Sequence, residues 1–68
     1  MSFGTISAMA EAYKVTPSQL GWYAARAADK AGVLDKITGD SARRAWALAN
    51  YELVAQEIAR GGCSHFWR

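Results

Sequence analysis

An interruption between two helical patterns constrains the fold of this chain more than any other feature. Apolar residues recur at helical spacing in the first pattern: Ile6, Met9, Ala10 and Tyr13. The pattern then stops and restarts with Thr16 as N-cap, Pro17 at the first helical position and Gln19 at the third, which is close to a capping box. The sequence therefore predicts two helices joined by a short turn.

The ends of these two helices are predicted from capping residues. Thr5 or Ser7 caps the first helix, which runs to about Tyr13. The second helix continues through an alanine-rich segment to about Ala31, and Gly32 supplies its stop.

Residues 33–50 allow two interpretations. In the first, "GVLDKI" and "RRAWAL" are the strands of a hairpin around "TGDSA", since Arg44, Trp46 and Leu48 alternate with alanines. In the second, a long helix begins at Ser41 and runs to Arg60, because alanine strongly favours helix. Local propensity favours the long helix.

Residues 50–62 are predicted to be helical under both interpretations. Asn50 is a candidate cap, and the glycine pair Gly61–Gly62 ends the helix. Tyr51, Val54 and Ile58 form one apolar stripe.

The composition indicates one small domain of 68 residues. Its single cysteine, Cys63, cannot form an internal disulfide, which favours a reduced, cytoplasmic compartment. The N-terminus does not resemble a signal peptide, and no apolar run approaches the roughly 20 residues that span a bilayer. We therefore expect a soluble protein without a membrane partner.

The net charge of +2 is unevenly distributed. Residues 14–44 carry six basic and three acidic residues, a net charge of +3, whereas the flanking segments are close to neutral. A basic middle segment is a weak indication of a polyanionic partner, and a solvated surface explains it equally well.

Residues 6–27 resemble the helix-turn-helix family. In that family a small residue packs where the two helices cross, and Ala10 occupies this place. The apolar positions around it also match: Met9, Tyr13, Val15, Leu20 and Tyr23. Lys14 departs from the pattern, because the family usually has glycine there to allow a left-handed turn.

The following residues, "ADKAGVLDKITGDSARRAWAL", resemble the end of a recognition helix followed by a β-hairpin wing. With the closing helix, the resemblance is to small MerR-like or phage excisionase-like winged helix-turn-helix regulators. It implies a mainly α winged helix-turn-helix domain over residues 1–62, followed by an aromatic tail over residues 63–68. The alternative is an all-α three-helix bundle with a long helix over residues 41–60.

The family resemblance implies double-stranded DNA as the partner, with the second helix in the major groove and the wing on the backbone. It implies a transcriptional repressor or a recombination accessory factor, nucleoid-associated in the cytoplasm, that binds as a homodimer or cooperative oligomer. The candidate DNA-binding residues are Thr16, Ser18, Gln19, Trp22, Arg26, Lys30, Lys36, Arg43 and Arg44.

Several of these residues have an alternative structural explanation. Gln19 is also the capping partner, and Trp22 is suited to burial against other aromatic residues. Arg26 is suited to a surface ion pair with Asp29, and Lys30 to one with Glu11.

Two other functions remain open from the sequence. One is a protein-interaction module, such as a phage-encoded inhibitor or adaptor that uses aromatic surface, including Phe66 and Trp67. The other is a peptide precursor whose leader ends at Gly62 and whose product is "CSHFWR". Cys63 and His65 fall short of a zinc site's four ligands, and no catalytic or cofactor motif occurs, so we expect neither a metal, a cofactor nor enzyme activity.

Overall fold

A computed structural model describes residues 3–61 of the chain. Its elements are α1 (Ile6–Tyr13), α2 (Pro17–Ala31), the short 3-10 helix η1 (Leu34–Lys36), α3 (Asp40–Ala49) and α4 (Tyr51–Gly61). The predicted tail lies outside the described residues.

The first two helices begin and end where capping residues predict. The Thr5 side chain accepts a hydrogen bond from the backbone N–H of Ala8 at 3.1 Å, which identifies Thr5 as the first cap. Thr16 and Gln19 form a complete capping box at the start of α2. Gly32 closes α2 in the left-handed conformation, with φ 77°. These predictions are confirmed.

A three-residue turn joins α1 to α2. Lys14 adopts the left-handed conformation with φ 60° and ψ 41°, which lets the backbone N–H of Val15 donate to the Ala10 carbonyl at 3.0 Å. Ala10 itself is 1% exposed. The turn therefore depends on a left-handed residue at position 14, although a lysine occupies this position, where glycine is favoured.

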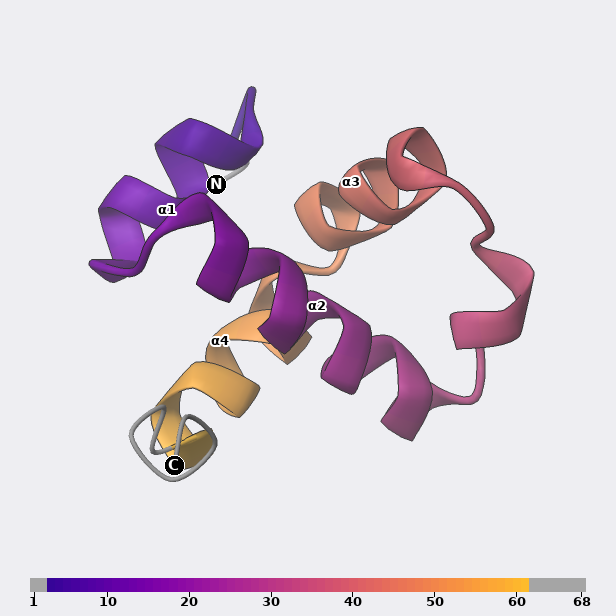
Figure 1. Ribbon diagram of the computed structural model, residues 1–68. Helices are drawn as coiled ribbons and strands as arrows, with labels where there is room; N and C mark the ends of the chain where they lie inside the picture. Colours follow the sequence, from indigo (N-terminus) through magenta and orange to yellow (C-terminus); the bar gives the residue numbers. More distant parts are fainter. Residues whose placement is uncertain (1–2, 62–68) are drawn as a thin grey trace.

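Helix α2 is the centre of the domain. It packs against α1, η1, α3 and α4, and Figure 1 shows it crossing the middle of the molecule with α3 and α4 on opposite sides. One apolar cluster fills the space between the helices: Met9, Ala10, Leu20, Tyr23, Ala24, Ala27, Ala47 and Val54. Because alanines supply half of these side chains, the helices lie close together around a core of few large residues.

The prediction of a β-hairpin wing is wrong. Residues 3–61 contain no strand, and the segment expected to turn between two strands instead begins α3 at Asp40. The alternation of Arg44, Trp46 and Leu48 with alanines fits a helix equally well, since Ala47 then faces the core between two half-buried neighbours. Alanine's helix propensity prevails, and the all-α alternative fits the structure.

The predicted long helix over residues 41–60 is divided at Asn50. The backbone of Asn50 leaves the helical region, with φ −119° and ψ 42°. Its side-chain amide donates to the Trp46 carbonyl at 2.9 Å, and its own carbonyl accepts from the backbone N–H of Leu53 at 3.0 Å. Asn50 thus satisfies groups at the end of α3 and the start of α4, which lets α4 turn its Val54 side into the core.

Candidate functional site

Two of the predicted DNA-binding cations form ion pairs with a buried acidic residue of α4. Arg26 Nε lies 3.0 Å from Glu57 Oε1, and Lys30 Nζ lies 3.1 Å from Glu57 Oε2. Glu57 is 4% exposed, so its charge is removed from water and neutralised by two cations one helical turn apart on α2. The expected surface pairs with Asp29 and Glu11 are replaced by this shared, buried partner on α4.

Trp22 also makes contacts within the fold. Its ring meets Tyr23 edge-to-face at a centroid distance of 5.5 Å, and the Arg26 guanidinium lies 5.6 Å from its ring centroid. Trp22 is half-buried as a result. These contacts place its ring against Arg26, one of the two partners of Glu57.

Two of the predicted polar residues at the start of α2, Thr16 and Ser18, are exposed. The Thr16 hydroxyl accepts from the backbone N–H of Gln19 at 3.1 Å, and Gln19 Oε1 accepts from the backbone N–H of Thr16 at 2.9 Å. The predicted capping role of Gln19 is therefore confirmed. Ser18 lies between them in sequence and is exposed.

The three residues assigned to the wing lie on helical elements instead. Lys36 is exposed at the end of η1, while Arg43 and Arg44 are exposed on α3. Arg43 Nε donates to the Ile37 carbonyl at 3.3 Å, and an Arg44 nitrogen lies 3.3 Å from Asp40 Oδ2. These arginines belong to an ordered helix that contacts α2, rather than to a projecting hairpin.

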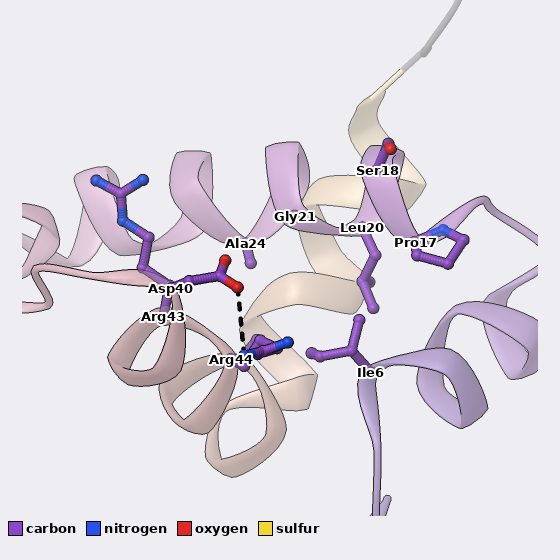
Figure 2. A pocket seen from close by; sticks show the side chains of 10 residues that line it. Ile6, Pro17, Ser18, Leu20, Gly21, Ala24, Asp40, Arg43 and Arg44 are labelled. Carbon is purple, nitrogen blue, oxygen red and sulfur yellow. Dashed lines mark ion pairs between the residues drawn. The ribbon is translucent and has the colours of Figure 1, made fainter.

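A groove of about 390 Å³ runs between α2 and α3 and ends at Ile6 of α1; we call it the α2–α3 groove. Pro17, Ser18 and Gly21 line its α2 side, and Arg43 and Arg44 line its α3 side. Figure 2 shows Arg44 extending toward Ile6, whereas Arg43 extends in another direction beside α2. The groove thus brings the exposed start of α2 next to two cationic side chains that are distant in sequence.

The sequence prediction missed the role of Glu57. Its signal was present, because Glu57 follows the core residue Val54 by three positions and therefore lies on the same side of α4. On α2, Arg26 and Lys30 are likewise separated by one turn and flank the buried Ala27. An acidic residue on an apolar helix side, matched with two cations on another helix, indicates an internal ion pair.

No family model, curated protein or solved structure matches this chain. None of the helices within residues 3–61 has the length and apolar character needed to cross a bilayer. In the same range, no three His, Cys, Asp or Glu side chains gather where a metal ion would be held. Cys63 and His65 lie outside the described residues.

Proposed function

We propose that this protein binds double-stranded DNA through the α1–α2 unit, assisted by α3. The observation that carries the proposal is the junction of α1 and α2. A three-residue turn joins the helices, its first residue, Lys14, has a left-handed backbone, and Ala10 is buried where the helices cross. This arrangement leaves Pro17 and Ser18 of α2 exposed, at the end of the helix that enters the major groove in helix-turn-helix proteins.

The charges near this end support a polyanionic partner. Arg43 and Arg44 are exposed and border the start of α2, and the helix N-terminus adds a partial positive charge. The Ser18 hydroxyl and backbone N–H are suited to phosphate oxygens, since Pro17 has no N–H and the Gln19 N–H donates to Thr16. The proposed phosphate contacts are therefore Ser18, Arg43 and Arg44.

Contacts within the fold reduce the number of predicted residues that remain available to contact DNA. Arg26 and Lys30 neutralise Glu57, and the polar groups of Thr16 and Gln19 take part in the capping box. We assign these residues to positioning α2, with DNA contact made by their exposed neighbours. A domain with so few phosphate contacts requires a dimer or cooperative binding for high affinity.

The apolar surface gives less support to a protein-interaction module. Among residues 3–61, Leu53 is the one large apolar side chain that is clearly exposed, at 39%. A single exposed leucine is common on monomeric proteins and does not form a docking patch.

Salt-dependent binding to a random-sequence duplex tests the proposal. The wild type is compared with the double variant Arg43→Gln, Arg44→Gln and with Lys36→Gln, Arg60→Gln, which has the same net charge but alters residues outside the groove. We expect affinity to fall with salt, and the groove variant to reduce the slope of log K against log[salt] by about 2, because each phosphate contact contributes about 1.

Two results would overturn the proposal. One is the absence of binding at low salt and high micromolar protein, which would direct the search to a protein partner. The other is an equal loss of affinity in both double variants, which would indicate a diffuse charge effect without a localised site. If binding is instead localised to the groove, selection from random DNA identifies the specific site, which is the basis for distinguishing a repressor from a recombination accessory factor.

A further inference from the structure

The α2–α3 groove combines an apolar floor with a cationic edge. Its apolar lining comes from three helices, and Ile6 and Pro17 supply the accessible part, because the core residues Leu20, Ala24 and Ala47 lie beneath it at 0%, 7% and 1% exposed. Figure 2 shows Leu20 and Ile6 pointing toward one another, with Arg44 beside them. The volume of about 390 Å³ lies at the lower end of the range of about 300–1,000 Å³ that small-molecule sites occupy. Its size suits a small ligand.

The charge of the lining favours a ligand with one negative charge. Arg43 and Arg44 face a single acidic residue, Asp40, so the lining has a net charge of +1. The Asp40 and Arg44 side chains are 84% and 57% exposed, which makes their ion pair weak. Arg44 can therefore exchange Asp40 for the carboxylate of a ligand at small energetic cost.

Gly21 separately supports a ligand site, because a glycine lets a ligand approach the backbone of α2 closely. It lies inside α2, where glycine destabilises a helix by about 1 kcal/mol relative to alanine. A Cβ atom at this position would meet no atom within 4 Å, so packing within the described fold does not require glycine. Glycine here leaves the α2 side of the groove open down to the backbone.

From these three observations we infer that the α2–α3 groove binds a small organic monocarboxylate with an aliphatic body. Arg44 donates hydrogen bonds to the carboxylate, and the aliphatic body lies on the accessible apolar surface of Ile6 and Pro17, beside Gly21. The inference does not depend on DNA binding. If the proposed function also holds, the ligand withdraws Arg44 from phosphate contact and lowers DNA affinity, which makes it a regulator of the same surface.

Titration of the full chain with sodium hexanoate, followed by ¹H–¹⁵N correlation spectra, tests the inference without DNA. Acetate has the charge without the aliphatic body, and 1-hexanol has the aliphatic body without the charge. We expect hexanoate to shift the amide signals of Gly21, Ala24 and Ala47 saturably, with a Kd of roughly 1 mM and at least about 5-fold tighter than either control.

Three variants locate the ligand. We expect Arg44→Gln to weaken hexanoate binding by about 5-fold or more, since it removes the charged donor. Gly21→Leu fills the groove and abolishes binding, and because position 21 is exposed, a retained thermal unfolding transition confirms that it folds. Arg60→Gln removes the same charge outside the groove and leaves binding unchanged.

The inference is overturned if hexanoate causes no saturable shift at these amides, or if 1-hexanol binds as tightly as hexanoate. It is also overturned if Arg44→Gln and Arg60→Gln weaken hexanoate binding equally. A failure of DNA binding alone leaves the hexanoate result unaffected, so the two proposals are tested separately.

Discussion

Glu57 of α4 is the shared partner of Arg26 on α2: Glu57 Oε1 lies 3.0 Å from Arg26 Nε, and its second oxygen lies 3.1 Å from Lys30 Nζ. The carboxylate side chain is 5% exposed, whereas the two cationic side chains are 30% and 43% exposed. A buried acceptor held by two partly hydrated cations joins the central helix to the closing helix. Loss of the Glu57 charge is therefore expected to lower the free energy of unfolding more than loss of either cation.

We expect Glu57→Gln to lower the free energy of unfolding by about 1–3 kcal/mol, because Arg26 and Lys30 lose the charge that offsets their partial desolvation. Urea denaturation measures the change. Asp40→Asn is the control, since it breaks the exposed pair with Arg44 and is expected to cost less than about 1 kcal/mol. Equal losses in the two variants would show that the Glu57 pairs behave as surface ion pairs.

The turn between α1 and α2 contains removable backbone strain. Lys14 is the one non-glycine residue with positive φ in the described part of the chain. We expect Lys14→Gly to raise the free energy of unfolding by about 0.5–1 kcal/mol, as glycine adopts this conformation without the Cβ clash. Thermal and urea unfolding measure the gain. Lys36→Gly, at a position without positive φ, is expected to destabilise, and stabilisation by both changes would contradict the strain argument.

The small side chain of Ala10 sets the distance between α1 and α2. Because Ala10 is 1% exposed at the helix crossing, we expect Ala10→Leu to lower the free energy of unfolding by about 1–3 kcal/mol through overpacking. The matched control is Ala12→Leu, the same change at an exposed position on the same helix. Denaturant unfolding compares the two, and a loss of similar size at both positions would reject a special role for the crossing.

The parts of the fold that were predicted correctly depend on local interactions. The Thr16–Gln19 capping box and the Gly32 stop involve residues within a few positions of one another, so the sequence contains all their determinants. The segment around Trp46 was ambiguous, because alternation with alanine satisfies both a strand and an alanine-rich helix. Alanine's propensity favours the helix, and the helix also places Ala47 in the core, a contact that involves residues distant in sequence.

The candidate site shows the same division between local and distant contacts. The exposure of Ser18 follows from its place in the first turn of α2, which the capping residues predict. The pairing of Arg26 and Lys30 with Glu57 depends on how α4 crosses α2, and Asn50 determines this crossing by ending α3. A break at one residue therefore changes which cations remain available to a partner.

Alkaline pH is expected to lower the free energy of unfolding through ionisation of Tyr13. Burial, followed by the nearby Tyr51 and Glu52, raises the pKa of Tyr13 above its ordinary value of 10.0. The folded state therefore holds the phenol proton more tightly than the unfolded state. This contribution to stability is complete below pH 10.0 and is lost as the pH rises through the folded pKa.

Tyr13→Phe removes the titrating group while it keeps the aromatic ring that meets Phe3 edge-to-face at a centroid distance of 5.7 Å. We expect the free energy of unfolding of the wild type to fall more steeply above pH 10.0 than that of the variant. Urea denaturation at a series of pH values measures both curves. If the two curves stay parallel from neutral pH into the alkaline range, ionisation of Tyr13 is not coupled to unfolding, and its hydroxyl is as well solvated in the folded state as in the unfolded state.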